Sequence, residues 1–309
     1  MRRIVSGMAI SLLTGCASLG LNLPKTMGEM SSGYTYVPVD PLLVDIQVEA
    51  PLPANAAEWS ERRYQACLSR RGKTQDGQPS KADLMDALPD HTIRMAIREM
   101  TGSTSGSYGP VAVGAAGQSY QVIVDSGFTD TTVVDFGIRV RSGDQLVPIR
   151  SVTKETEPAV DIEVVRLDGA PVPSGFEPVS MPIYVGVALR LTATLTVKSG
   201  TVDLGLSTLG AKAEAKKVSG NLVVQSLGIY GQQVGATFGI PNELNQTAIQ
   251  NALVSLGAVK AIVYDRDTGT RPRITGIYNP LPLSSPKLIN RIYAALASRP
   301  VLWKPCLPA

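Results

Sequence analysis

The sequence has little of what most catalytic sites are built from. Its 309 residues include one histidine, three cysteines and only 5% aromatic residues. A catalytic triad would have His91, beside Asp90, as its one imidazole base, and a zinc site there would lack a second imidazole. A capping or surface role explains His91 better. We therefore expect no catalytic residue, no metal and no cofactor.

A large excess of charge of either sign is also missing. The chain has 29 basic and 26 acidic residues and a net charge of +3. That charge falls to about +1 if the first 15 residues, which include Arg2 and Arg3, are removed. A nearly neutral chain gives no electrostatic reason to bind nucleic acid or to attach through a polybasic membrane patch.

The composition instead favours strands and turns. Val, Leu, Ile and Thr provide most of the apolar and β-branched content, and the chain has 29 Gly and 22 Pro. Such a composition is typical of sheets joined by turns rather than of a helical bundle. Together with the segments below, it predicts a β-rich α+β fold: antiparallel sheets, a long three-strand meander at 183–230 and a few packed helices.

The N-terminus carries an export signal. Two arginines precede eleven uncharged, mostly apolar residues at 4–14, and Leu13-Thr14-Gly15-Cys16 follows. The run is long enough for a secretory signal and too short to span a bilayer. Its ending resembles the lipobox of bacterial lipoproteins. The alternative is an ordinary signal peptide with a chance cysteine.

The resemblance implies that residues 1–15 are removed and that Cys16 becomes the acylated N-terminus. Each buried methylene contributes about 0.8 kcal/mol, so several acyl chains hold a protein firmly on a membrane. In the enteric members of this class, an Asp after the cysteine favours the inner membrane. Ala17 stands there, which points to an outer-membrane location.

Acylation of Cys16 would leave Cys67 and Cys306. Two cysteines in an oxidising envelope usually form a disulfide. This bond would close a loop of roughly 240 residues, which corresponds to a stabilisation on the order of 5 kcal/mol. Two buried free thiols are the alternative.

The rest of the chain divides into three segments. Residues 16–57, rich in Pro and Gly, predict an extended tether. Residues 58–180 predict helices followed by a β-rich region, with helices at 59–71, 80–88 and 91–100, a loop at 102–109, and strands at 120–124, 133–140 and 162–167. Residues 181–309 predict the meander, two helices and a hairpin.

The clearest pattern is the alternation from Ile183 to Lys198, which predicts a strand of roughly 50 Å. Returning strands are expected at 201–215 and 222–230. The residues on its apolar side face either a core or a membrane: Ile183, Val185, Val187, Leu189, Leu191, Ala193, Leu195 and Val197.

The C-terminal part predicts a helix over 242–257 that would cover this sheet. A hairpin is expected from strands at 259–264 and 273–278. A last helix, capped by Ser285-Pro286, would run to Ser298 and bury Leu288, Ile289, Ile292 and Leu296. Trp303 and Cys306 would hold the tail beneath it.

The acidic residues Glu155, Glu157, Asp161 and Glu163 are clustered in sequence. Two carboxylates could serve as the catalytic pair of a glycosidase. Acids at alternate positions are more often one solvated face of a strand, which is the better interpretation here.

Three functions follow from these patterns. The first is a non-enzymatic outer-membrane lipoprotein, a structural subunit of an envelope or secretion assembly with copies of itself or other envelope proteins. The alternatives are an oligomeric pore or secretion channel lined by 183–230, and a carboxylate-based envelope hydrolase. The lipobox, mixed α/β body and long amphipathic strands resemble curli-secretion lipoproteins in layout, although no motif carries over residue by residue.

Overall fold

The computed structural model describes residues 35–46, 84–85, 87–88, 90–101, 104–108, 113–152, 156–205, 209, 211–231, 244–265, 268–279 and 285–303. The predicted lipobox, most of the tether, the helix at 59–71 and all three cysteines lie outside these residues. The lipidation and disulfide predictions therefore stay predictions.

The strands are β1 Thr35–Ile46, β2 Asp90–Thr101, β3 Thr104–Tyr108, β4 Val113–Ala115, β5 Ser119–Ser142, β6 Gln145–Leu146, β7 Asp161–Arg166, β8 Glu177–Val197, β9 Thr201–Asp203, β10 Val218–Leu227, β11 Ile229–Tyr230, β12 Gly269–Thr270, β13 Arg273–Asn279 and β14 Val301–Trp303. The helices are α5 Lys212–Ala215, α7 Gln246–Gly257, α8 Val259–Tyr264 and α9 Pro286–Ala297, with 3₁₀ turns η2 Ile149–Ser151 and η3 Glu157–Ala159. This is the β-rich α+β class that the sequence predicts.

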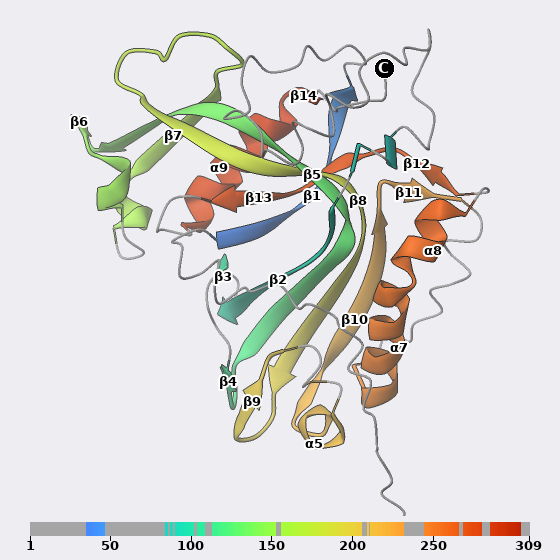
Figure 1. Cartoon of the computed structure of the whole chain (residues 1–309). Coiled ribbons are helices and arrows are strands. Elements are labelled where there is room, and N and C mark those ends of the chain that lie inside the picture. The colour runs from blue at the N-terminus through green and yellow to red at the C-terminus, as the bar shows by residue number, and fades with distance from the viewer. Residues whose placement is uncertain are drawn as a thin grey trace, which may run out of the picture.

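A ten-stranded sheet organises the described residues in the order β14-β1-β13-β8-β5-β2-β3. β10 also pairs with β8, while β6 and β7 pair with β5. The antiparallel strands β5 and β8, of 24 and 21 residues, form its spine and stay in register from Ser119 opposite Thr196 to Ile138 opposite Glu177. Strands on either side of residue 180 thus belong to one sheet, as Figure 1 shows.

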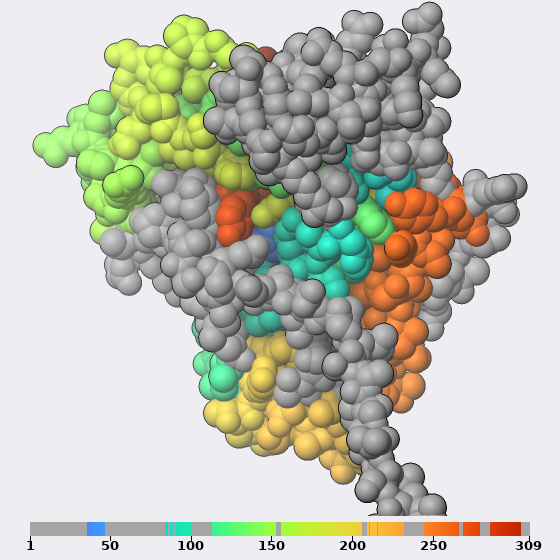
Figure 2. Space-filling model, viewed as in Figure 1, coloured from blue at the N-terminus to red at the C-terminus, as the bar shows by residue number. Residues whose placement is uncertain are grey.

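The alternation of β8 places eight apolar side chains on one face, at every second position from Ile183 to Val197. All eight apolar side chains from Ile183 to Val197 are at most 1% exposed. The helix α7, which begins after the N-cap Asn245, packs against β8 and β10 through Ala248, Ile249, Ala252 and Leu256. With α8 it forms an outer layer along one side of the molecule (Figure 2). The helix predicted at 242–257 and its packing on the sheet are confirmed.

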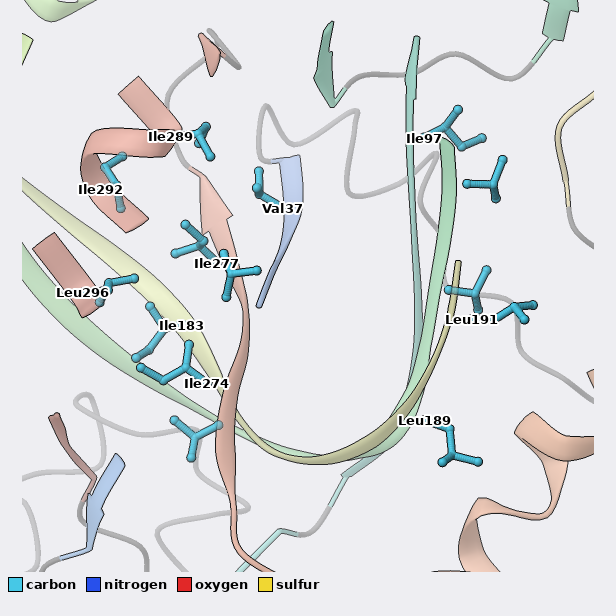
Figure 3. Close-up of a cluster of buried hydrophobic side chains, with 14 of the residues drawn as sticks. Val37, Ile97, Ile183, Leu189, Leu191, Ile274, Ile277, Ile289, Ile292 and Leu296 are labelled. Carbon is cyan, nitrogen blue, oxygen red and sulfur yellow. The ribbon is translucent and has the colours of Figure 1, made fainter. Parts of the chain in front are cut away.

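The two spine strands bend together where they carry glycines. A Cβ atom on Gly186 would lie 2.1 Å from the carbonyl oxygen of Phe128, and one on Gly127 would lie 2.2 Å from that of Val187. The backbones approach closely there because neither residue has a side chain. Figure 3 shows β8 turning between Ile183 and Leu189, so the sheet has two arms.

The second arm carries the C-terminal elements. The side chain of Ser285 caps α9 by accepting a hydrogen bond from the Leu288 amide. The helix buries the four predicted residues against the sheet (Figure 3). After it, β14 pairs in parallel with β1, and Trp303 is fully buried. Trp303 is buried as predicted, whereas Cys306 lies outside the described residues.

Two predictions before residue 110 are wrong. Residues 91–100 form the strand β2, paired with β5 from Asp90 to Met100, and not a helix. The spacing of Ile93, Ala96, Ile97 and Met100 fits a helical face, but pairing with the long neighbouring strand determines the conformation. The expected loop at 102–109 contains the strand β3.

Two later predictions are also wrong. The strand expected at 201–215 is limited to the three residues of β9, which pair with β4 instead of β8. Further along the same segment, the chain forms the helix α5. Residues 259–264 form α8 instead of a hairpin strand, and its Val259 and Val263 are buried at helical spacing. The predicted hairpin is absent from these residues, and the short strand β12 pairs with β11. No helix among the described residues is long and apolar enough to cross a membrane.

The bend can be tested with Gly186→Ala. The added methyl group collides with the backbone of β5, so the free energy of unfolding should fall by about 1–3 kcal/mol in urea titrations. Gly257→Ala is the matched control, because a Cβ atom there meets no atom within 4 Å. The control should leave stability unchanged or higher, and equal effects of the two variants would contradict the assignment of the bend.

Candidate functional site

A buried ion pair lies at the centre of the sheet. Asp125 on β5 and Arg190 on β8 are directly opposite each other, and each residue is 4% exposed. Nε and Nη2 of Arg190 donate to Oδ1 and Oδ2 of Asp125, both at 2.7 Å. This is the bidentate geometry that makes guanidinium–carboxylate pairs strong. A pair this deep is stable only if its other polar atoms also have partners.

Two neighbouring strands satisfy the rest of the guanidinium. Nη1 of Arg190 donates to the carbonyl of Val39 and Nη2 to that of Thr275, both at 2.7 Å. Val39 lies in an irregular part of β1, where the register with β13 shifts between Pro38 and Leu42. Proline lacks the N–H needed for regular pairing, and the interruption leaves this carbonyl available to the arginine.

The hydroxyl of Tyr36 donates a further hydrogen bond to Oδ2 of the Asp125 carboxylate. Burial, together with the charge of Asp125, raises the pKa of Tyr36 well above its usual value, so the phenol stays protonated and donates. Burial alone would lower the pKa of Arg190, but the hydrogen bonds and charge of Asp125 outweigh it and raise that pKa. Tyr36 and Arg190 therefore both keep their protons at neutral pH.

A second arginine flanks the pair. Arg94 on β2 is opposite Asp125 on its other side, so the three charged residues form a row across β2, β5 and β8. The guanidinium carbon of Arg94 lies 3.6 Å from the ring centroid of Tyr184, a cation–π contact. Its Nη1 donates to Thr92 at 2.5 Å and Thr129 at 3.1 Å. The row contains two positive charges and one negative charge.

A polar cleft of about 320 Å³ reaches Arg190 from the side of α9. Its described lining is Val37, Pro38, Val39, Asp40, Arg98, Gln121, Ile123, Arg190, Thr192, Gln225, Ile289, Asn290 and Tyr293. Oε1 of Gln121 is buried and accepts no hydrogen bond from the described residues. Amide, hydroxyl and guanidinium groups can recognise a polar ligand by hydrogen bonds. We therefore take this cleft, which has Arg190 of the ion pair in its lining, as the candidate site.

The strand residues predicted to face a core or a membrane face the core. Side chains from Ile183 to Val197 are covered within this chain: they belong to one core cluster that also contains the buried residues of α7 and α9. The polar face of the same strand carries Arg190 and Thr192 into the cleft. For 183–230 to form the wall of a pore with this apolar face toward lipid, the chain would have to uncover that face.

His91 lies apart from the cleft. It is exposed on β2, with Nε2 3.4 Å from Oγ of Ser126 and its ring 5.1 Å from that of Phe128. Partial burial and the charge of Lys260 lower its pKa. His91 and Arg94 point to opposite faces of β2 because their positions differ by an odd number. The structure therefore does not bring the histidine to the ion pair.

The clustered carboxylates separate into different roles. Glu157 is buried and accepts hydrogen bonds from the Ser285 hydroxyl and the Lys287 amide, at the start of α9. This corrects the expectation that it belongs to a solvated face. Glu163 pairs with Arg139, and Asp161 is exposed. Glu155 lies outside the described residues.

Within the described ranges, no three His, Cys, Asp or Glu side chains are grouped so as to hold a metal ion. Comparison of the chain with protein-family models, with curated proteins and with solved structures gives no match.

The ion pair can be tested by Asp125→Asn, which leaves the Arg190 charge buried without its counterion. The free energy of unfolding should fall by about 3–5 kcal/mol. Glu163→Gln removes an acid from a half-exposed pair and should cost less than about 1 kcal/mol. Asp125→Leu combined with Arg190→Met should recover much of the loss. Similar small effects for both single variants would contradict the role of the pair.

Proposed function

We propose that this chain is a lipid-anchored, non-enzymatic subunit of an assembly at the bacterial outer membrane. The signal Leu13-Thr14-Gly15-Cys16 motivates the anchor and the location. The buried charged residues of the folded part support the structural role.

The observation that carries the proposal is the use of the buried acids. Asp125 binds Arg190, Asp130 accepts a hydrogen bond from Nε1 of Trp303 at 2.8 Å, and Glu157 caps α9. Each bond joins elements far apart in sequence. A carboxylate held by structural donors is poorly placed to act as a base or nucleophile. This use of the acids supports a scaffold over a hydrolase.

The position of β1 supports a subunit that transmits force. β1 is the first described strand after Cys16, and it lies between two partners. It pairs antiparallel with β13 and in parallel with β14. The side chain of Arg190 also holds its Val39 carbonyl. A load that enters from a membrane anchor would therefore pass into strands bonded on both sides.

The polar cleft supports contact with a partner. Asp40, Gln225 and Asn290 line it and offer both donors and acceptors. The partner is another copy of this chain or a second envelope protein. A peptide segment with free backbone groups has the matching chemistry.

The proposal can be tested with the full-length chain expressed with its own signal. In mild non-ionic detergent, we expect acylated protein from the outer-membrane fraction in particles whose protein mass, after bound detergent is subtracted, exceeds that of one chain. Cys16→Ser should abolish acylation and outer-membrane retention, whereas Ser18→Ala should not. A strictly monomeric particle from which cross-linking recovers no second chain would refute the assembly role.

A further inference from the structure

A second cleft borders the irregular part of β1 at Pro41. It has a volume of about 610 Å³, and its described lining is Pro41, Ser226, Gly228, Ile229, Tyr230, Arg271 and Arg273. Two arginines, a tyrosine and a serine provide donors, and the described lining includes no acid. The described part of its lining therefore carries positive charge and no negative charge.

The sequence Arg271-Pro272-Arg273 places the two cations together. A residue before proline is restricted to extended conformations, and residues two apart in an extended chain point to the same side. The backbone N–H of Arg271 donates to the Gly228 carbonyl at 2.8 Å, and Arg273 lies opposite Gly186 in β8. The sheet thus fixes both backbone positions before any ligand binds.

The cations have no counterion among the described residues. No carboxylate in that part of the chain pairs with Arg271 or Arg273. Partial burial, together with the charge of Arg271, lowers the pKa of Arg273, which is the direction expected for like charges held close. Arg190 and Arg139, by contrast, each pair with a carboxylate. An anion would relieve this repulsion.

The remaining lining suits an organic group attached to the anion. Tyr230 is 60% exposed, and a Cβ atom on Gly269 would lie 2.2 Å from its ring, so the ring packs over the glycine. Ile229 and Pro41 add apolar surface. The cleft is much larger than an inorganic phosphate ion. Two guanidinium groups match the double charge and oxygen geometry of a phosphate.

We propose that this cleft binds a phosphate ester, with Arg271 and Arg273 on the phosphate and Tyr230 against the organic part. The ester is either a phospholipid headgroup or a soluble phosphate compound, since both present the same group. This site is independent of the proposed assembly role, which can fail without affecting it.

Calorimetric titration of the detergent-purified, full-length protein tests the proposal. The probes are inorganic phosphate, glycerol 1-phosphate and dihexanoyl phosphatidic acid below its micellar concentration. We expect saturable binding, with an affinity lowered roughly tenfold to hundredfold in Arg271→Gln/Arg273→Gln. Preference for the phosphatidic acid would identify a lipid headgroup, and preference for glycerol 1-phosphate a soluble ester; either supports the site.

The matched control is Arg150→Gln/Arg291→Gln, which removes the same charge from two exposed arginines elsewhere. It should bind as the wild type does. Equal binding by both double variants, or binding of none of the probes by the wild type, would overturn the proposal. If Arg271→Gln/Arg273→Gln unfolds, the single variant Arg271→Gln, at an exposed position, is titrated with the same probes and compared with the wild type and the control.

Discussion

The fold depends on one buried ion pair. Arg190 and Asp125 join the two spine strands, and the same guanidinium binds carbonyls of β1 and β13. The Arg190 side chain of β8 thus forms hydrogen bonds to β5, β1 and β13, strands whose bonded residues range from position 39 to position 275. Buried pairs contribute little net stability compared with apolar packing, but they strongly disfavour alternatives that leave a charge unpaired. We infer that this pair specifies how the two arms of the sheet are arranged.

The bend in the spine allows this arrangement. Gly127 and Gly186 let β5 and β8 approach closely and turn, which brings β1 and β13 over the polar face of the sheet. Residues of β1 within the irregular part at Pro38–Leu42 line both clefts. One cleft suits a hydrogen-bonding partner and the other suits an anion. Both positions follow from backbone features rather than from loops.

Sequence reasoning succeeds where a local period is long. The apolar side of β8 and the buried face of α9 are both predicted residue by residue, because each pattern persists over several turns or pairs. Residues 91–100 and 259–264 are too short to separate helix from strand. Arg190 is visible in sequence as a lone charge within a long alternating strand. Its partner Asp125 is 65 positions away, and only the register of β5 with β8 identifies it.

The most direct test of the central claim is native-state hydrogen exchange of the wild type and Asp125→Asn, comparing the backbone amides of β13 with those of β8. In the wild type, both sets should exchange only through global unfolding, because the pair couples the strands. In the variant, the amides of β13 should exchange through a separate opening of lower free energy, while those of β8 still require global unfolding. If β13 and β8 stay coupled in the variant, the pair does not join the two arms and the account is contradicted.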